Sequence, residues 1–371
     1  MRVAIVSASG GGSRRYRCDH RAEMLELGGA RVEVYPDSYR RTILDRGLLD
    51  YDCVILHRAP GSRQLERFVQ EARVAGTAVL YDTDDLVFEP DLAARISWTA
   101  KFPEEVGRGK LASRRRAMAA CTGVTVSTEP LRRAASAVNP HVIVLPNVVD
   151  TAMVAAASPD AWPRREPAEG VVIGYFSGTA SHDDDFREAT AAVGDVLEAC
   201  PTARLLVVGP LTLDPVLARF GPRIERIERR PFTELPRLIG LVDLALAPIE
   251  RGNPFAEAKS GIKYLEAGLV GVPVLASATS DFARVIRDRE TGLLATTHEE
   301  WHTRLLELVH DSALRASLGR AAWDDVRACH TTSARAGTDN AALAGLLSAT
   351  RARLTPGLLL ARARWRLRKA R

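Results

Sequence analysis

The feature that most constrains the fold is an alternation of short apolar segments with helical segments, which runs along the chain twice. In the first run the apolar segments are residues 2–7, 31–35, 53–57, 77–81, 124–127 and 141–145. The stretches between several of them have helical spacing. Strands that alternate with helices form parallel sheets whose two faces are both covered. This pattern predicts a doubly wound α/β domain.

The alternation stops at residues 151–169, a stretch rich in Ala and Pro that we interpret as a linker. It restarts with the apolar segments 171–176, 205–208, 242–247 and 291–295. The predicted fold is therefore α/β, with two Rossmann-like doubly wound domains that face a cleft. The predicted parts are an N-terminal domain at 1–150, the linker, a second domain at 170–335, and a helix with a basic tail at 336–371.

Composition excludes several classes of protein. No run of 18 apolar residues predicts a transmembrane helix, and the start MRVAIVSASGGG lacks the pattern of a signal peptide. The five cysteines are scattered without a CxxC pair, so we expect reduced thiols in a cytoplasmic protein. Residues 351–371 hold eight Arg and Lys and no acid, leaving 43 basic and 46 acidic residues elsewhere. The net charge of +5 thus arises from a local basic tail and does not predict nucleic-acid binding.

A glycine-rich loop, Ser9-Gly10-Gly11-Gly12-Ser13, follows the first predicted strand and precedes a helix predicted at 14–27. Glycine lets a ligand reach the backbone, and the start of a helix favours an anion. The predicted contacts are Gly11 and Gly12 in the loop and, on the acceptor or phosphate side, Arg14, Arg15 and Arg17. The loop is not GxGxxG, so it does not predict a dinucleotide site. A tight turn between strand and helix is the alternative.

Polar side chains follow two other strands of the first domain. Residues 77–81 lead into Asp82-Thr83-Asp84-Asp85, and residues 53–57 end in His57. Ligands bind at the carboxyl ends of strands in open α/β sheets, so we predict catalytic roles for Asp82, Asp84 and His57. Helix capping and a solvated loop are the structural alternative.

The stretch Asn253–Ser277, NPFAEAKSGIKYLEAGLVGVPVLAS, predicts a loop, a helix and a buried strand. Lys259, Lys263 and Glu266 are separated by helical steps, which puts two cations and a carboxylate on one face. Ser260 is predicted to cap this helix. Such a helix would bind a phosphate at its N-terminus and a sugar hydroxyl at its carboxylate. A surface helix with Lys–Glu pairs is the alternative.

In order and spacing these pieces resemble nucleotide-sugar-dependent glycosyltransferases of the GT-B fold, in particular the retaining group often called family four, or glycosyl transferases group 1. The resemblance covers nearly the whole chain. It rests on the first glycine loop, VVD at 148–150 after Pro146-Asn147, IGYFSGTASHDDDF at 173–186, KSGIKYLEAGLVGVPV at 259–274 and ETGLLA at 290–295.

Three departures mark an atypical subgroup. The family has a glutamate eight positions before the one at Glu266, where this chain has Ala258. The loop after the first strand of the second domain lacks the usual Arg and Lys and reads Ser177-Gly178-Thr179. Many members carry a histidine near the reacting carbon, where this chain has the aspartates at 82–85.

The resemblance implies an enzyme that transfers a sugar from a nucleoside diphosphate sugar to an acceptor, with retention and without a metal or other cofactor. Glu266 would bind the nucleotide ribose. The diphosphate would be held by the glycine loop, Ser177, Gly178, Thr179, Lys259, Ser260 and Lys263. Stabilising oxocarbenium-like charge and accepting the proton of the acceptor hydroxyl would fall to the carboxylates of the first domain.

The predicted partners are the nucleotide-sugar donor and a sugar, lipid-linked or small-molecule acceptor, as in the synthesis of cell-surface polysaccharides, glycolipids or glycosylated natural products. Residues 355–371 mix leucines and Trp365 with arginines, which suits an anionic membrane at the inner face of the plasma membrane. A disordered tail or a packed helix is the alternative. For the whole chain the alternatives are a nucleotide-sugar epimerase, a metal-dependent transferase using Asp82-Thr83-Asp84, and a non-catalytic binding subunit.

Overall fold

The computed structural model describes residues 1–35, 39–157, 170–178 and 182–350. The chain divides into two compact units, and the division falls at Asn147 and Val148. The first unit comprises Met1–Asn147 together with Arg335–Arg371, and the second comprises Val148–Ala334. The chain therefore returns to its first unit after completing the second.

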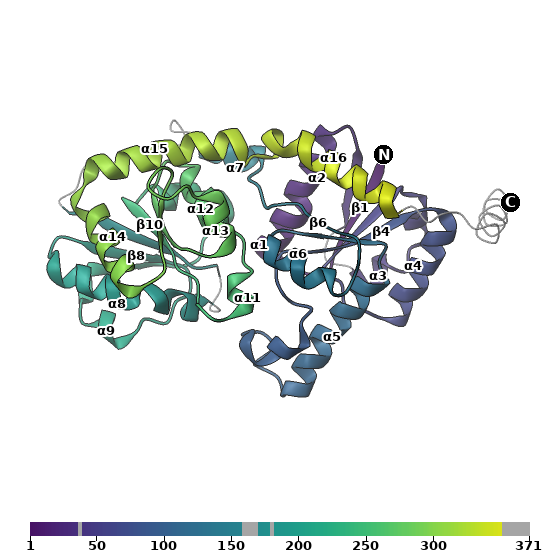
Figure 1. Ribbon diagram of the computed structural model, residues 1–371, viewed down its shortest axis with the longest axis horizontal. Helices are drawn as coiled ribbons and strands as arrows, with labels where there is room; N and C mark the ends of the chain where they lie inside the picture. The colour runs from purple at the N-terminus through teal and green to yellow at the C-terminus, as the bar shows by residue number, and fades with distance from the viewer. Residues whose placement is uncertain (36–38, 158–169, 179–181, 351–371) are drawn as a thin grey trace. The chain divides into compact units, whose positions relative to one another are not determined.

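The first unit is built on a parallel six-stranded sheet in the order β2-β1-β3-β4-β5-β6 (Figure 1). The strands are β1 (Arg2–Ser7), β2 (Arg31–Tyr35), β3 (Cys53–His57), β4 (Ala78–Thr83), β5 (Gly123–Val126) and β6 (Val142–Val144). The helices among them are α1 (Gly11–Arg14), a π-helical turn (Arg15–Asp19), α2 (His20–Leu27), α3 (Tyr39–Thr42), α4 (Arg63–Ala75), α5 (Glu104–Ala120) and α6 (Glu129–Ser136).

The last described helix, α16 (Thr332–Thr350), completes the core of the first unit. Leu343 and Leu346 pack in one apolar cluster with Val3 and Ile5 of β1. The amide of Asn340 donates a hydrogen bond of 2.8 Å to the carbonyl of Met24. These contacts explain why a segment so late in the sequence belongs to the first unit.

The second unit contains another parallel six-stranded sheet, in the order β12-β11-β10-β7-β8-β9. The strands are β7 (Val172–Phe176), β8 (Arg204–Val208), β9 (Ile224–Ile227), β10 (Leu244–Ala247), β11 (Val274–Ser277) and β12 (Leu293–Ala295). The helices are α7 (Thr151–Ala156), α8 (Asp183–Ala199), α9 (Pro215–Ala218), α10 (Leu235–Ile239), α11 (Pro254–Glu257), α12 (Ile262–Gly268), α13 (Ser280–Val285), α14 (His298–His310) and α15 (Ser312–Cys329). Counted from β7, this is the doubly wound order whose switch point lies between β7 and β10.

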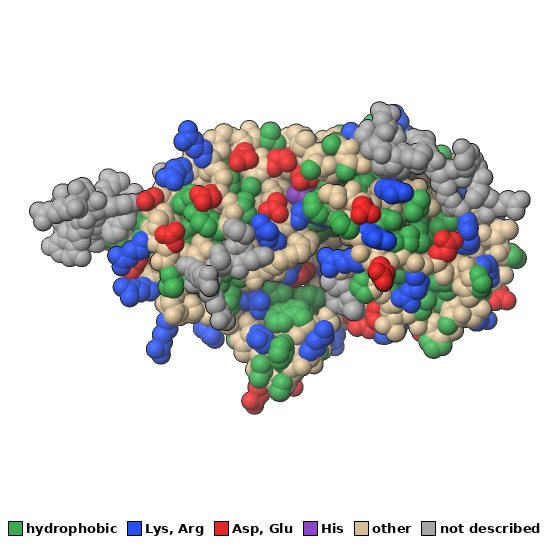
Figure 2. Space-filling view, turned by 180° about the vertical axis from the view of Figure 1, so that it is seen from behind, with side chains coloured by type: hydrophobic (Ala, Val, Ile, Leu, Met, Phe, Trp, Pro, Cys, Tyr) green, Lys and Arg blue, Asp and Glu red, His purple; other side chains and the backbone are tan. Residues whose placement is uncertain are grey.

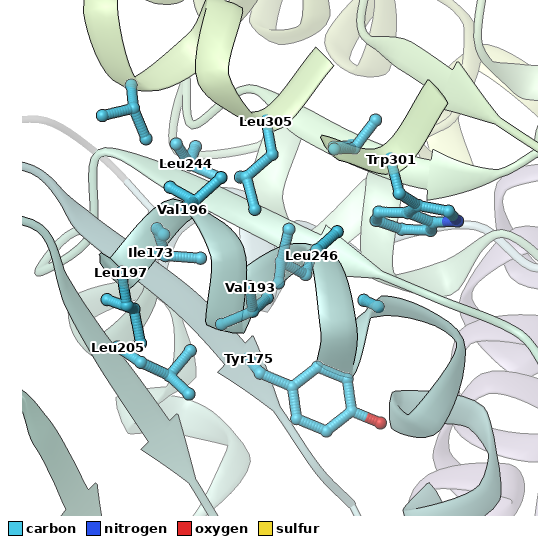
Figure 3. Packing of buried hydrophobic residues seen from close by; sticks show 14 of the residues in the cluster. Ile173, Tyr175, Val193, Val196, Leu197, Leu205, Leu244, Leu246, Trp301 and Leu305 are labelled. Carbon is cyan, nitrogen blue, oxygen red and sulfur yellow. The ribbon is translucent and has the colours of Figure 1, made fainter. Parts of the chain in front are cut away.

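The core of the second unit lies between its sheet and the helices α8 and α14 (Figure 3). Val193 and Val196 of α8 meet Leu244 and Leu246 of β10, and Trp301 of α14 is only 1% exposed. Strands buried on both faces read as continuous apolar runs, and β10 (LALA) has that character. This packing holds the carboxyl ends of β7 and β10 in place.

The prediction of two doubly wound α/β domains is confirmed. Strands β1, β2 and β3 have the predicted bounds. The sequence prediction missed β9, an edge strand whose sequence IERI places two charged residues in its middle. Of the predicted linker, Thr151–Ala156 forms α7 in the second unit, and residues 158–169 lie outside the described residues.

Three observations bear on the sequence predictions. Within the described ranges, no helix is long and apolar enough to cross a membrane. Lys and Arg side chains are interspersed with Asp and Glu side chains on the face seen in Figure 2. All five cysteines are free, with only Cys329 exposed. The predicted membrane segment at 355–371 lies outside the described residues.

Candidate functional site

Four side chains gather around the carboxyl end of β7, which we call the lysine–histidine cluster: His182, Asp185, Lys259 and Lys263. Asp185 Oδ2 accepts hydrogen bonds from Lys259 Nζ at 2.5 Å and from His182 Nδ1 at 2.8 Å. The backbone N–H of Glu250, beyond β10, donates to Asp185 Oδ1 at 3.1 Å. Burial would raise the pKa of Asp185, but His182 and Lys259 lower it to about 2. Asp185 therefore stays ionised near neutral pH, and its hydrogen bonds connect the loop after β7 with the segment after β10.

Lys263 differs from Lys259 in having no carboxylate partner within the described residues. Its Nζ donates a hydrogen bond of 2.5 Å to the carbonyl of Phe176 and lies 4.4 Å from the centre of the Tyr175 ring. Burial lowers the pKa of Lys263 to about 8. An ammonium has three donors, and a carbonyl uses one of them. Asp185 and Glu266 only partly offset the effect of burial on this ammonium group, so the site is suited to receive an anion.

The backbone that carries the two lysines differs from the predicted single helix. Helix α11 ends at Glu257, Lys259 lies in the turn that follows, and α12 begins at Ile262. The N-terminal cap of α12 is Gly261, whose N–H donates to Asp281 Oδ2 at 2.8 Å. The predicted cap at Ser260 and the shared helix face of Lys259 and Lys263 are therefore wrong. The short turn brings the two lysines together instead.

The loop after β7 has a tightly constrained backbone. The N–H of Ser177 donates to the carbonyl of Val208 at 2.8 Å. Gly209 has φ +90°, and a Cβ there would lie 2.1 Å from the carbonyl oxygen of Ser177. Among the described residues beyond its chain neighbours, a Cβ on Gly178 would meet only His182 Nε2, at 3.9 Å. The predicted contacts Ser177 and Gly178 thus adjoin the cluster, whereas Thr179 lies outside the described residues.

Glu266 lies on α12, one turn after Lys263, and is half-buried. Its negative charge opposes the lowering of the Lys263 pKa. The structure therefore places Glu266 near the cluster. Its predicted contact with a ribose stays a prediction.

In the first unit, a row of polar residues crosses the carboxyl ends of four strands. The parallel register pairs Ser7 with His57, His57 with Asp82, and Asp82 with Thr125. His57 is fully buried, with Nδ1 2.8 Å from Ser7 Oγ and Nε2 3.0 Å from Ser13 Oγ. Ser13 Oγ also donates to Asp84 Oδ1 at 2.7 Å. The predicted residues His57, Asp82 and Asp84 are therefore brought together, and Ser13 links two of them.

Asp82 is paired with Arg17. Arg17 Nε donates to Asp82 Oδ1 at 2.9 Å and Nη2 donates to Oδ2 at 2.6 Å, with both side chains buried. Thr125 Oγ1 donates to the same Oδ2 at 2.5 Å. Burial would raise the pKa of Asp82, but Arg17 holds it below the ordinary value.

The remaining donor of Arg17, Nη1, reaches the carbonyl of Leu145 at 2.6 Å and Asn147 Oδ1 at 3.1 Å. Asp82 and Arg17 therefore link β4 to the segment that follows β6. This differs from the predicted roles, a catalytic carboxylate and an anion-facing cation, because the contacts of both groups are already used within the fold.

Asp84 is held by Arg58, whose Nε and Nη2 donate to Asp84 Oδ1 at 2.9 and 2.6 Å. Arg58 also pairs with Asp85 and has φ 51°, a left-handed conformation that strains a non-glycine residue. Burial opposes ionisation of Asp84, but Arg58 and then His57 hold its pKa well below the ordinary value. Within the described residues, the side-chain hydrogen bonds to Asp84 all end on Oδ1, so Oδ2 is the oxygen left for a ligand.

The three carboxylates at 82, 84 and 85 are thus all engaged by guanidinium groups. In the described part of the chain, no group of three His, Cys, Asp or Glu side chains is arranged to hold a metal ion. Arginines in these positions would compete with a cation, which weakens the interpretation of Asp82-Thr83-Asp84 as a metal motif.

The glycine loop of the first unit is open. Gly11 has φ +73°, and a Cβ on Gly11 or Gly12 would meet no described residue within 4 Å. Arg14 pairs with Asp19 at 3.4 Å, and Arg15 lies over the ring of Tyr16. Contacts of Gly11, Gly12, Arg14 and Arg15 with a ligand stay predictions.

Sequence reasoning missed four residues: Ser13, Arg58, His182 and Asp185. His182 and Asp185 belong to the motif IGYFSGTASHDDDF, and their spacing of three at a predicted helix start was the available signal. Ser13 closes the glycine loop, and Arg58 directly follows a predicted strand. Nothing in the sequence shows that they meet Asp84, because that contact depends on the register of β1, β3 and β4.

Comparisons with known proteins bear on the family and the fold of the chain. The family model of glycosyl transferases group 1 matches residues 170–311. D-inositol 3-phosphate glycosyltransferase from Corynebacterium aurimucosum is 29% identical over 149 residues, which are 36% of this chain and 34% of the relative. The chain thus matches only about a third of the length of that curated relative.

Two solved structures share the fold over most of the chain. Sucrose-phosphate synthase from Thermosynechococcus elongatus has a TM-score of 0.64 at 15% identity, over 94% of this chain and 99% of the other. HepE from Anabaena in complex with UDP and glucose has a TM-score of 0.62 at 16% identity, over 94% and 100%. Residues 170–311 therefore resemble the glycosyl transferases group 1 family, and the chain as a whole shares the GT-B fold of these two structures.

Proposed function

We propose that this protein is a glycosyltransferase that moves a sugar from a nucleoside diphosphate sugar to an acceptor. The donor diphosphate binds at the lysine–histidine cluster, against Lys259, Lys263 and the backbone at Ser177 and Gly178. Glu266 contacts the ribose. The structurally similar HepE was solved in complex with UDP and glucose, which makes UDP the first nucleotide to test on this chain.

One observation carries the proposal. Lys263 is a sequestered lysine with a lowered pKa and, within the described residues, no carboxylate partner. It lies beside the switch point of a doubly wound sheet, which is where such folds bind ligands. A diphosphate supplies the missing negative charge and accepts the donors that the Phe176 carbonyl leaves unused.

The acceptor chemistry is proposed for Asp84. Its Oδ1 is fixed by Ser13 and Arg58, and Oδ2 is left to accept a hydrogen bond from an acceptor hydroxyl and so orient it. His57 supports the ionised form of Asp84 from the other side of Ser13. We further propose transfer with retention and without metal, at the cytoplasmic side of a membrane, to a sugar, lipid-linked or small-molecule acceptor.

A thermal-shift screen of UDP, GDP and TDP tests the donor site, because a ligand that binds the native state raises its melting temperature. The proposal predicts that one diphosphate raises the melting temperature and that its sugar conjugate supports transfer. Stabilisation by none of them, at concentrations up to millimolar, contradicts the donor site.

The same screen separates the alternatives when it is followed by product analysis. Turnover of the donor sugar without any acceptor identifies an epimerase. Binding without transfer to any acceptor in a broad panel identifies a non-catalytic subunit. Loss of transfer on adding a chelator overturns the metal-independent mechanism, and retention is read from the anomeric configuration of the product.

A further inference from the structure

His182 faces the proposed diphosphate site in a fixed tautomer. Its Nδ1 is 2.8 Å from Asp185 Oδ2, and Asp185 is ionised, so Nδ1 must carry the proton that this hydrogen bond uses. The backbone of His182 is held as well, since Tyr175 Oη donates to its carbonyl at 3.2 Å. The second ring nitrogen, Nε2, therefore points in a direction set by the fold.

Nε2 lies beside the open glycine of the loop after β7. A Cβ on Gly178 would lie 3.9 Å from Nε2, and no other heavy atom of the described residues beyond its chain neighbours would lie within 4 Å of it. No hydrogen bond from a described residue reaches Nε2. An anion above Gly178 would therefore be next to this nitrogen.

When no ligand is bound, a second proton on the His182 ring is disfavoured by burial and by most of the charged groups that face it. They are Asp185 of α8, Lys259 in the turn before α12 and Lys263 of α12. Burial lowers the pKa of His182, Lys263 and Lys259 lower it further, and only Asp185 opposes them. Near pH 7 the free protein thus has a lone pair on Nε2, which would repel a phosphate oxygen.

We propose that His182 is a phosphate-binding residue that takes up one proton when the donor diphosphate binds. The proton comes from solvent and adds to the Nε2 lone pair, and the resulting N–H donates to a phosphate oxygen while Nδ1–H keeps its bond to Asp185. His182 then supplies a cation that this loop otherwise lacks. The inference rests on the proposed function, because it assumes a diphosphate at the cluster.

The binding of UDP by calorimetry in buffers of different ionisation enthalpy tests this proposal. At pH 7.0 Lys263, with its pKa of about 8, is already largely protonated and contributes little proton uptake. The wild-type protein should take up between about half a proton and one proton per UDP bound, and affinity should fall up to about tenfold per pH unit above pH 7.

Matched variants identify the residue. His182→Asn keeps a donor near the position of Nδ1 but removes Nε2, so proton uptake should disappear and affinity at pH 7.0 should fall about tenfold. His298→Asn, at an exposed histidine of the same unit, should change neither.

Wild-type binding of UDP without proton uptake overturns the role of His182 and leaves the donor site intact. Uptake that persists in a folded His182→Asn variant also overturns it. If UDP, GDP and TDP all fail to bind, the proposed function fails together with this inference.

Discussion

The two polar clusters of this protein lie at equivalent edges of two similar sheets, yet their charges are arranged differently. In the first unit, Arg17 is matched with Asp82, and Arg58 with Asp84 and Asp85. In the second unit, Asp185 serves both Lys259 and His182, and Lys263 is left with a carbonyl and an aromatic ring. Every carboxylate of the first cluster is paired with a guanidinium, whereas Lys263 of the second cluster has no carboxylate hydrogen-bond partner among the described residues.

This difference suggests different roles: the first cluster holds its side chains in one geometry, and the second is suited to bind an anion. Paired buried charges fix side chains at one geometry, which suits groups that orient an acceptor. A sequestered cation without a partner gains most from an added anion. We therefore assign the diphosphate to the second unit and the acceptor chemistry to the first.

The largest effect is expected from Asp84→Asn. If Oδ2 orients the acceptor hydroxyl, this change should lower the transfer rate about 10²-fold, as for a misplaced reactant. Steady-state transfer with the best donor measures it. Asp85→Asn changes the outer partner of Arg58 and should cost much less, so equal losses in the two variants would contradict the assignment.

Breaking the Arg17–Asp82 pair should destabilise the first unit. Asp82→Asn leaves a buried guanidinium without its counter-ion, which costs about 3–5 kcal/mol of the free energy of unfolding. Urea denaturation, followed by probes in each unit, measures this loss. The matched control is Glu71→Gln in the exposed pair Arg67–Glu71, where a change below about 1 kcal/mol is expected. A stable Asp82→Asn protein that had lost only transfer would restore a catalytic role to Asp82.

Two glycines, one that packs against the loop after β7 and one in the loop after β1, should respond differently to substitution by alanine. Gly209→Ala places a Cβ against the carbonyl of Ser177 at a left-handed backbone position, which should cost about 1–3 kcal/mol and weaken nucleotide binding. Gly10→Ala, where a Cβ meets nothing within 4 Å, should leave stability nearly unchanged. Chemical denaturation of both variants checks the contrast, and equal losses would refute the tight packing of the second loop.

The smallest effect is the pH dependence due to Lys263. The ammonium form binds the diphosphate, and the pKa of the free residue is about 8, so the contribution of Lys263 to affinity is present below that pH and is lost as the pH rises through it. Between about pH 8 and pH 9 this contribution should approach a tenfold decline per pH unit, added to any decline due to His182. Lys263→Arg keeps its charge and should make the curve less steep in this range. An unchanged slope in that variant would assign the titration to another group.

Much of this fold follows from sequence pattern, because buried parallel strands read as apolar runs with clear boundaries. The edge strand β9 escaped prediction since its charged residues hide the pattern. The site was predicted less well. Lys259 and Lys263 were identified, but one helix was predicted where a turn separates α11 from α12, because the turn signal of Ser260-Gly261 was given less weight than the helical spacing of the charged residues.

Contacts between distant segments account for the remaining differences. Arg17 and Asp82 are 65 positions apart, and only the packing of the π-helical turn against β4 shows that they neutralise each other. Asp185 and Lys259 are 74 positions apart. Charge pairing of this kind has no local signature, so sequence reasoning identifies the charged residues but not which of them remain available to a ligand.

The central claim is that the donor diphosphate binds the second unit through Lys263. Calorimetric titration of UDP, or of whichever diphosphate the screen selects, into wild type, Lys263→Met and Asp84→Asn tests it directly. Loss of a charge-assisted contact worth about 1.5–3 kcal/mol predicts affinity about ten- to a hundredfold weaker in Lys263→Met. Asp84→Asn should bind within about twofold of wild type. Unchanged affinity in Lys263→Met, with loss of binding in Asp84→Asn, would contradict the account.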